Sequence, residues 1–489
     1  MTEKKNASII IKNEVECKIE GLELVDRKRL KDKFSLFVPG RFHMPSYKLG
    51  RWDGKIEFFN IGGKTYNGLL DQILPLLLER NYEIDVIDER LYKEEIQFEQ
   101  ITDDVFSDCV WPAGHPAEGE PIVLRDYQVE AINYFLKNTQ GIQSVSTAAG
   151  KTIVTAGLSK MVEPLGRSVV IVPSQNLVKQ THEDFVNLGL DVGLYYGGHK
   201  DEGKTHTIYT WQSISSLIRQ RSAQKSAKGP DELFKGVAAV IVDEAHGAAS
   251  KDLKTILAGP AKDVPIRWGL TGTIPKDDVA RISLLTHIGP VINTITAKEL
   301  QDAGHLSNCE INILQLKDNI VYNDYQAELN YLVTNSKRLD YLATLIQDTA
   351  KTGNILVLVD RIKTGELLIE RIGEDNATFI RGSVKTNDRA DHFKSIKHNG
   401  NSITIATKSL AAVGINVPEL NHIMMLEPGK SFIRVIQSIG RGLRKTKNKD
   451  HVVIWDITSN AKYSKRHLTD RKKYYSESQY PFVIKKIDY

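Results

Sequence analysis

The sequence predicts an α/β protein in which two tandem parallel-sheet domains follow a small α/β N-terminal domain. Its length of 489 residues corresponds to roughly three domains at about 150 residues each. Its composition, 41% hydrophobic and 26% charged, is that of an ordinary globular chain. Beyond residue 122, short β-branched runs alternate with helical patterns, which is typical of βα units around a parallel sheet. This length excludes a single small binding module.

The N-terminal region is predicted to be a separate domain. Residues 1–105 mix short apolar runs with aromatic and basic residues and contain no nucleotide motif. The following stretch, Asp103–Pro121, combines acidic residues with three prolines and two glycines. Such a composition neither continues a helix nor forms a central strand. We interpret it as the linker to the first sheet domain, which we place at residues 106–295.

Five apolar runs are the candidate strands of the two sheets, because strands buried on both faces are apolar along their length. These runs are Ser168–Val172, Val237–Val242, Ile355–Val359, Ser402–Ala406 and Val452–Trp455. The alternation is interrupted near residues 290–340, where the sequence is polar. We therefore expect a second sheet domain at residues 296–460 and a basic C-terminal tail at residues 461–489.

Composition also bears on the cellular location of the protein and on its binding partners. No stretch approaches the roughly 18 consecutive apolar residues that a membrane span needs, and the N-terminus lacks the features of a secretory signal. We expect a cytoplasmic protein without a membrane partner. The three cysteines are far apart and are not grouped with histidines at zinc spacing. A net charge of +4 is too small to indicate nucleic-acid binding by itself.

A phosphate-binding loop is the first chemical signal. The segment Ser146–Thr152, STAAGKT, follows the candidate strand Gly141–Val145 and precedes a helical pattern. In this context backbone N–H groups surround a phosphate, Lys151 reaches the terminal phosphates, and the Thr152 hydroxyl ligates Mg²⁺. The strict pattern requires a glycine where this chain has Val145. An ordinary helix start with a surface lysine is therefore the alternative.

An acidic pair is the second signal. Asp243 and Glu244 directly follow the apolar run Val237–Val242, at the end of a parallel strand where such sheets bind ligands. Asp243 is the candidate Mg²⁺ ligand, and Glu244 is the candidate base that orients and deprotonates the attacking water. The alternative is an acidic cap at the start of a helix. The loop some 90 residues earlier favours the catalytic interpretation.

Together with DEAH at Asp243–His246, these motifs resemble those of superfamily 2 helicases, which implies two RecA-like motor domains that use ATP and Mg²⁺. Gln128, within Leu124–Gln128, is similar to the residue that reads adenine, and Ala149, Gly150, Lys151 and Thr152 correspond to the phosphate loop. His246, Thr271 and Thr273 resemble the segment that couples hydrolysis to movement. The strand-contacting motifs of the first domain correspond to Pro173, Ser174, Thr210, Trp211 and Ser213.

The second domain continues the resemblance. Arg381, Gly382, Ser383 and Thr407 are similar to its strand-contacting residues, and Gly414 to a nucleotide-binding residue. The run Gln437–Arg444, QSIGRGLR, implies that Gln437, Arg441 and Arg444 complete the catalytic set. A guanidinium that faces the γ-phosphate from across a cleft accelerates its transfer by about 10³ to 10⁵. A solvated basic helix is the alternative for the two arginines.

One subfamily fits better than the general class. The series TAAGKT, TWQS, DEAH, TGT and QSIGRGLR, with an N-terminal segment around Arg51, Trp52, Asp53 and Gly54, resembles the phage UvsW-type branch-migration helicases. The resemblance implies a DNA-stimulated ATPase that remodels branched DNA such as forks and four-way junctions, in the cytoplasm of a bacterial host. An RNA-directed member of the superfamily and an ATP-gated clamp that does not translocate are the alternatives.

Two regions combine basic and aromatic residues, as a surface that neutralises phosphates and stacks on bases does. One surrounds Arg51 and Trp52 and includes Arg41, Phe42, Tyr47, Lys48 and Lys55. The other is the C-terminal tail, with Lys462, Lys465, Arg466, Arg471, Lys472 and Lys473 among three tyrosines. The alternatives are an aromatic core with outward lysines in the first region and a solvated charged face in the second.

Overall fold

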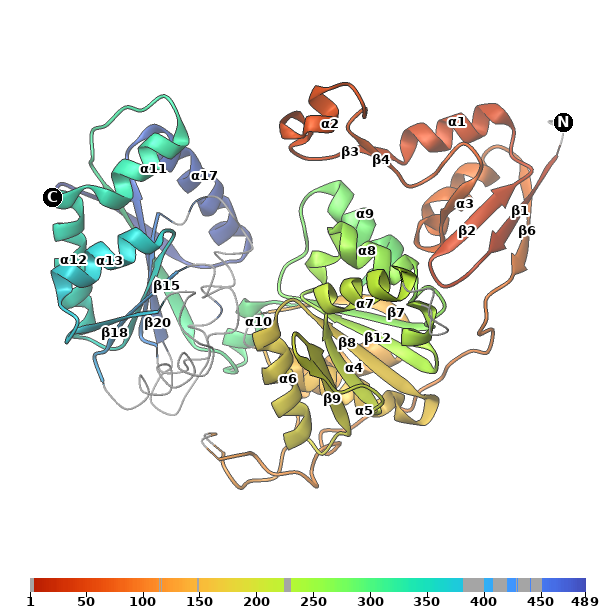
Figure 1. Ribbon diagram of the computed structural model, residues 1–489, viewed down its shortest axis with the longest axis horizontal. Helices are drawn as coiled ribbons and strands as arrows, with labels where there is room; N and C mark the ends of the chain where they lie inside the picture. The colour runs from red at the N-terminus through yellow and green to blue at the C-terminus, as the bar shows by residue number, and fades with distance from the viewer. Residues whose placement is uncertain are drawn as a thin grey trace. The chain divides into compact units, whose positions relative to one another are not determined.

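The computed structural model describes residues 4–113, 115, 117–146, 149–223, 230–380, 400–407, 420–427, 429, 440 and 451–489. The chain divides into two compact units (Figure 1). The first consists of Met1–Val145 and Lys151–Thr294, and the second of Ser146–Gly150 and Ile295–Tyr489. Within the described ranges, every helix is too short or too polar to span a bilayer.

The first unit begins with a mixed sheet in the order β5-β2-β1-β6. Its strands are β1 (Lys5–Ile11), β2 (Glu16–Glu20), β5 (Lys64–Tyr66) and β6 (Tyr82–Asp88). Strand β1 pairs antiparallel with β2 and parallel with β6. The helices α1 (Leu24–Lys33), η2 (Asn67–Leu69) and α3 (Leu70–Leu78) contribute to an apolar core with residues such as Ile9, Phe59 and Ile73. This module therefore has a core of its own.

A small substructure, here called the head, is inserted in this module. Strand β3 (Ser35–Phe37) pairs antiparallel with β4 (Lys55–Glu57), and the two enclose η1 (Arg41–His43) and α2 (Pro45–Lys48). In Figure 1 these elements lie apart from the strands β1, β2 and β6. The head, residues 35–57, thus has its own two-stranded sheet.

The N-terminal module packs against α9 (Asp278–His287) of the same unit. At Gly68 an added Cβ would lie 2.4 Å from the carbonyl oxygen of Leu285, so only glycine permits this approach. The ring of Tyr66 lies 5.3 Å from that of His287. The Glu14 carboxylate accepts a 2.8 Å hydrogen bond from Gln140 Nε2. These contacts hold the module to the sheet domain that follows.

The segment predicted to be a linker carries little regular structure among its described residues. Between β6 and α4 (Asp126–Leu136), the described residues form no helix or strand, and one isolated bridge joins Val110 to Pro121. The prolines and glycines of this segment explain why the backbone does not continue either kind of element.

The first large sheet has the strand order β10-β9-β11-β8-β12-β13-β7-β14 among the described residues. Apart from the edge pair β9–β10, its registered pairs are parallel. The strands are β7 (Gln140–Val145), β8 (Arg167–Val172), β9 (Val192–Tyr196), β10 (His199–Lys200), β11 (His206–Thr210), β12 (Val237–Asp243), β13 (Ile266–Thr271) and β14 (Val291–Ile295). The candidate strands Ser168–Val172 and Val237–Val242 are confirmed as β8 and β12.

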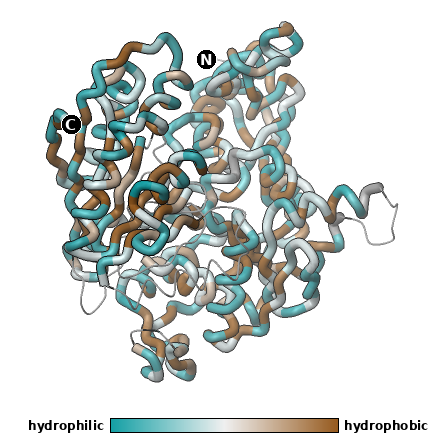
Figure 2. The backbone as a smooth tube through the Cα atoms, turned by 60° about the vertical axis from the view of Figure 1, so that its left-hand side comes forward, coloured by the Kyte–Doolittle hydropathy of each residue, from teal (hydrophilic) through white to brown (hydrophobic). Residues whose placement is uncertain are grey.

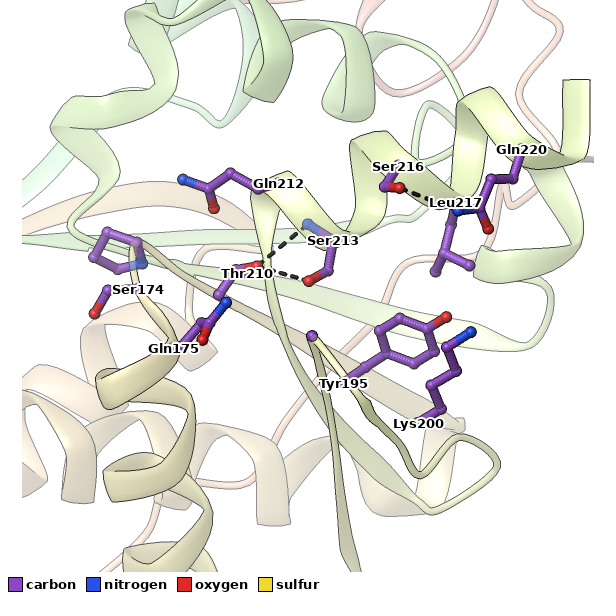
Figure 3. Close-up of a pocket in the computed structure, with 12 residues that line it drawn as sticks. Ser174, Gln175, Tyr195, Lys200, Thr210, Gln212, Ser213, Ser216, Leu217 and Gln220 are labelled. Atoms are coloured by element: carbon purple, nitrogen blue, oxygen red, sulfur yellow. Dashed lines mark hydrogen bonds between the residues drawn. The ribbon is translucent and has the colours of Figure 1, made fainter. Parts of the chain in front are cut away.

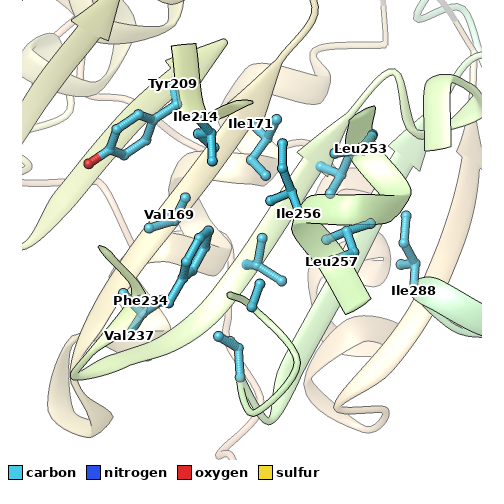
Figure 4. Packing of buried hydrophobic residues seen from close by; sticks show 14 of the residues in the cluster. Val169, Ile171, Tyr209, Ile214, Phe234, Val237, Leu253, Ile256, Leu257 and Ile288 are labelled. Atoms are coloured by element: carbon cyan, nitrogen blue, oxygen red, sulfur yellow. The ribbon is translucent and has the colours of Figure 1, made fainter. Parts of the chain in front are cut away.

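Helices cover both faces of this sheet (Figure 1). They are α4, α5 (Lys151–Val162), η3 (Glu163–Leu165), α6 (Gln175–Asn187), α7 (Trp211–Ala223), η4 (Pro230–Phe234), η5 (Ala245–Ala249), α8 (Lys251–Ala258) and α9. Figure 4 shows Leu253, Ile256 and Leu257 of α8 in the same buried apolar cluster as Val169 and Ile171 of β8. In Figure 2 hydrophobic stretches gather inside the folded units and hydrophilic stretches outside, as burial of apolar area requires.

The second unit contains a sheet in the order β17-β18-β16-β19-β20-β15-β21 among the described residues, with parallel registered pairs. The strands are β15 (Asn308–Leu316), β16 (Ile355–Val359), β17 (Ala377–Ile380), β18 (Ile403–Thr407), β19 (His422–Leu426), β20 (His451–Ser459) and β21 (Phe482–Ile487). The described helices are α10 (Ala297–Asp302), α11 (Tyr325–Thr334), α12 (Ser336–Ala350), α13 (Ile362–Ile372) and α17 (Lys462–Glu477). The candidate strand Ile355–Val359 has the bounds of β16.

The C-terminal residues join this second sheet. Helix α17 leads into β21, which pairs in parallel with β15. Arg471 of α17 is 1% exposed and binds the Asp456 carboxylate through two nitrogens, at 2.8 and 2.9 Å. The basic run is therefore divided by the fold, because Arg471 lies in the interior while Lys473 is exposed at the surface.

Candidate functional site

The phosphate loop lies between β7 and α5. Of its residues, Thr147 and Ala148 lie outside the described residues. Gly150 has a φ of +78°, a conformation that glycine adopts without strain. Helix α5 begins at Lys151, so its first N–H groups and the positive end of its dipole face the loop. Ala149 is fully buried and Thr152 is half-buried. This is the arrangement that the sequence predicts for binding a phosphate.

The acidic pair lies where β12 ends. Asp243 is the last residue of the strand, and its Oδ1 accepts a 2.8 Å hydrogen bond from the backbone N–H of Glu244. Glu244 has φ and ψ of 51° and 49°, in the left-handed region that a glutamate seldom adopts. This conformation costs of order 1–3 kcal/mol and is typical of functional positions. The turn directs the two carboxylates to different contacts: Asp243 accepts from the Glu244 backbone, and Glu244 faces Lys151 and His246.

Lys151 and His246 flank Glu244. Lys151 Nζ lies 3.3 Å from Glu244 Oε1, and His246 Nδ1 lies 3.3 Å from Glu244 Oε2. His246 Nδ1 also lies 3.1 Å from Thr271 Oγ1, at the end of β13. The Thr271 hydroxyl donates to the Thr273 carbonyl at 2.9 Å. The structure thus joins the acidic pair to the predicted coupling residues Thr271 and Thr273 through one chain of contacts.

Burial and charge separate the two carboxylates further. Burial, followed by the neighbouring Glu244, raises the pKa of Asp243 from 3.8 to about 6. Burial also acts to raise the pKa of Glu244, but the positive charge of Lys151 and the contact with His246 outweigh it and hold that pKa at about 2. Glu244 is therefore the more acidic of the two. Its Oε2 is buried and has a long contact of 3.3 Å with His246 Nδ1, which leaves this oxygen able to accept a hydrogen bond from water.

This donor set fits a nucleotide and a divalent cation. Mg²⁺ takes few protein ligands and binds through carboxylate, hydroxyl, water and phosphate oxygens. Asp243 and Thr152 would hold the ion, and Lys151 would contact the phosphates. Bound there, Mg²⁺ would supply charge neutralisation at the transferred phosphate.

Gln128 lies on α4, close to the start of that helix. It is 6% exposed, and its side-chain oxygen accepts a 3.0 Å hydrogen bond from the backbone N–H of Arg125. This bond orients the amide and caps the helix. Its predicted contact with adenine stays a prediction.

A groove of about 570 Å³ brings four predicted strand-contacting residues together (Figure 3). Pro173 and Ser174 follow β8, while Thr210 ends β11 and Ser213 lies in the first turn of α7. Thr210 Oγ1 lies 2.8 Å from Ser213 Oγ, so one hydroxyl orients the other. Gln212 of the TWQS motif also lines the groove. The other lining residues, which no motif predicted, are Gln175, Tyr195, Gly197, Lys200, Ser216, Leu217 and Gln220.

Trp211 is placed differently. It begins α7 but packs against the apolar core of the first sheet, and its ring would lie 3.4 Å from a Cβ at Gly247. The described lining of the groove does not include it. Its contact with a strand stays a prediction.

The head presents aromatic and basic side chains together. The Arg41 guanidinium lies 4.1 Å from the Phe37 ring centre and 4.4 Å from that of Phe42, whose side chain is 57% exposed. Trp52 is half-buried, and its Nε1 donates to the Lys55 carbonyl at 2.8 Å. Arg51 is exposed. The head is therefore partly an aromatic core and partly a stacked, cationic surface.

The second unit supplies one described candidate. Thr407 is the last residue of β18, at the carboxyl end of the sheet, and is 6% exposed. Arg381, Gly382, Ser383, Gly414, Gln437, Arg441 and Arg444 lie outside the described residues.

Three family models match successive parts of the chain. They are the N-terminal region of the DNA helicase UvsW at residues 11–88, the res subunit of type III restriction enzymes at 121–276, and the helicase conserved C-terminal domain at 337–446. The ATP-dependent DNA helicase uvsW of Enterobacteria phage T4 is 26% identical over 466 residues, which are 91% of this chain and 89% of that protein.

Solved structures show the same fold. A fragment of a putative HsdR subunit of a type I restriction enzyme from Vibrio vulnificus YJ016 has a TM-score of 0.57 and 15% identity, over 96% of this chain and 85% of that one. The S. cerevisiae protein Dbp5, bound to RNA and ADP BeF3, has a TM-score of 0.54 and 15% identity, over 75% of this chain and 90% of that one. The predicted fold class, with two RecA-like domains after a small α/β domain, is confirmed.

Proposed function

Because the chain is a superfamily 2 helicase of the UvsW type, we propose that it hydrolyses ATP with Mg²⁺ to move along DNA and remodel forks and four-way junctions. One observation carries the catalytic part of this proposal: the contact of Lys151 with Glu244, and of Glu244 with His246, beside the phosphate loop. In this role the protein acts in the cytoplasm of a bacterial host.

The residues divide the hydrolysis among them. Lys151 and the N–H groups at the start of α5 bind the phosphates of ATP. Glu244 holds the attacking water and accepts its proton, a task that suits a buried carboxylate oxygen with a single long contact to His246. Gln437, Arg441 and Arg444 stabilise the charge of the transferred phosphoryl group from the second domain. His246, Thr271 and Thr273 couple ATP hydrolysis to a movement of the strand-binding residues.

One DNA strand occupies the groove of the first unit. Ser174, Thr210 and Ser213 offer hydroxyl groups there, and phosphate oxygens accept such hydrogen bonds. In the second domain Arg381, Gly382, Ser383 and Thr407 hold the same strand. Repeated closure on ATP and reopening after hydrolysis shift the grip along the backbone.

The head is proposed to engage the branch. Phe42 and Trp52 offer rings on which unpaired bases at a branch stack, and Arg41, Arg51 and Lys55 neutralise phosphates beside them. The cation–aromatic contacts of Arg41 order this surface before DNA arrives. Because the N-terminal module packs on α9, the head stays attached to the unit that holds the tracked strand.

The direct test is migration of a labelled four-way junction in the presence of ATP or of a nonhydrolysable analogue. We expect strand exchange with ATP only. The Glu244→Gln variant is the matched control, because it keeps the size and shape of the side chain but loses the carboxylate that accepts the proton. Junction migration by this variant at the wild-type rate would contradict the assignment.

The same preparation separates the two alternatives. Stronger stimulation of ATP turnover by RNA than by forked or single-stranded DNA would indicate an RNA-directed enzyme. Tight binding of the junction that depends on nucleotide, without any strand exchange, would indicate a clamp.

A further inference from the structure

The groove of the first unit extends well beyond the residues that its motifs predict. Ser174 and Thr210 lie at one end (Figure 3). At the other end Tyr195 and Lys200 face the part of α7 that carries Leu217 and Gln220. A volume of about 570 Å³ is in the range of ligand sites, which runs from about 300 to 1,000 Å³. The groove is therefore large enough to hold a base as well as a phosphate group of the bound strand.

The chemistry of the lining points to bases. Sites that hold the nucleic-acid backbone by charge alone use several lysines and arginines, whereas Lys200 is the one charged side chain among the described residues of this lining. The lining instead carries three amides, those of Gln175, Gln212 and Gln220. An amide both donates and accepts hydrogen bonds, as the edge of a base does, while phosphate oxygens only accept.

The far end of the groove is preorganised. Lys200 is the antiparallel partner of Tyr195 in the β9–β10 hairpin, and the Tyr195 ring stacks on that of Tyr209 with 5.4 Å between centres. Leu217 is 8% exposed and belongs to the core of the sheet. Gln220 is exposed, and its Nε2 donates to Ser216 Oγ at 3.3 Å. A rigid apolar floor thus lies beside an oriented amide.

We propose that Tyr195, Lys200, Leu217 and Gln220 form a pocket for one nucleobase of the tracked strand. The edge of the base hydrogen-bonds to the Gln220 amide, its face rests on the floor made by Leu217 and Tyr195, and Lys200 contacts the adjoining phosphate. This proposal rests on the proposed function and adds a base contact to a grip made otherwise through the backbone.

The test combines an abasic scan with a protein variant. Forked DNA, whose duplex end sets the register, carries one abasic residue at successive positions of its single-stranded arm. Affinity is measured with a nonhydrolysable ATP analogue present. We expect the wild type to lose about tenfold in affinity when one particular base is missing, since base contacts of this kind are worth about that much. The Gln220→Ala variant binds intact DNA more weakly and loses most of this dependence.

Arg219→Ala is the matched control. Arg219 directly precedes Gln220 in α7, is exposed, and does not line the groove. It removes a charge but keeps the abasic penalty at its wild-type size. Thermal unfolding checks that both variants fold. The proposal is overturned if the wild type binds every abasic DNA equally well, or if Gln220→Ala keeps the full penalty. Junction migration by the wild type in the same preparation shows whether the proposed function fails too.

Discussion

Lys151 and Glu244 contact each other across the edge of the first sheet, with 3.3 Å between Nζ and Oε1. One begins α5 after β7 and the other follows β12, and β13 lies between these two strands in the sheet. The contact places the candidate phosphate-binding cation directly beside the candidate base. It also supplies a buried carboxylate with a counter-charge, without which the folded state would favour its protonation.

The Lys151→Met variant tests this contact. Methionine keeps much of the length of the side chain but removes the charge that faces both Glu244 and the phosphates. We expect ATP turnover to fall by about 10² or more, which is the usual loss when one transition-state donor is removed. Steady-state turnover with forked DNA measures it. Turnover within a few-fold of the wild type would contradict the role of Lys151.

The arginines of the second domain form the other half of the proposed catalytic site. The Arg441→Ala variant is expected to lose about 10³ in turnover, because an arginine at the γ-phosphate contributes about 10³ to 10⁵. Lys485→Ala, at an exposed position of β21, is a control that leaves turnover unchanged. Equal ATP turnover of the two variants would contradict a catalytic role for Arg441.

The head offers a test of branch recognition. The double variant Phe42→Ala/Arg51→Ala removes one exposed ring and one exposed cation, so we expect about tenfold weaker binding of a four-way junction. Leu24→Ala, at a 59% exposed position of α1 outside the head, is the control. Gel-shift titration at one fixed salt concentration compares them. Unchanged affinity of the double variant would assign the branch contact elsewhere.

A buried ion-pair network in the second unit predicts a stability effect. Arg338 is 1% exposed and lies 2.7 Å from both Asp318 and Glu427. Arg338→Met leaves these carboxylates without their counter-charge, so we expect the unfolding free energy to fall by about 3–5 kcal/mol. Breaking the exposed pair of Arg371 and Asp340 with Arg371→Met should cost at most about 1 kcal/mol. Urea unfolding of the two variants measures the difference.

His287 predicts a pH dependence of stability. Burial, with the nearby charges of Arg267 and Lys254, lowers the pKa of His287 from 6.5 to about 4. Between pH 6.5 and about pH 4, His287 is protonated in the unfolded chain but stays neutral in the folded chain. The contribution of His287 to the unfolding free energy is therefore complete above pH 6.5 and is lost as the pH falls toward 4. The full loss is about 3 kcal/mol at 1.36 kcal/mol per pKa unit. His287→Gln should show a smaller decline between pH 7 and pH 4.5 in urea unfolding, and an equal decline would contradict the assignment.

Local sequence was enough for the elements that carry the chemistry. The run Ile355–Val359 predicts the bounds of β16, because a continuous apolar run is typical of a parallel strand that is buried on both faces. Asp243 is likewise found at the end of β12, since the apolar run stops there. The basic C-terminal run was less informative. Charge alone did not distinguish Arg471, buried against Asp456, from the exposed Lys473 two positions later.

By itself the sequence determined the phosphate loop, the acidic pair, the alternation of strands and helices, and the family resemblance, because each depends on residues that are neighbours in the chain. Only the tertiary structure decided which distant residues meet. Tyr195 and Gln220 line one groove because β9 and α7 are brought together by the parallel sheet, and no local pattern marks either side chain. Contacts between elements depend on strand order and helix packing, which the alternation of residue types leaves open.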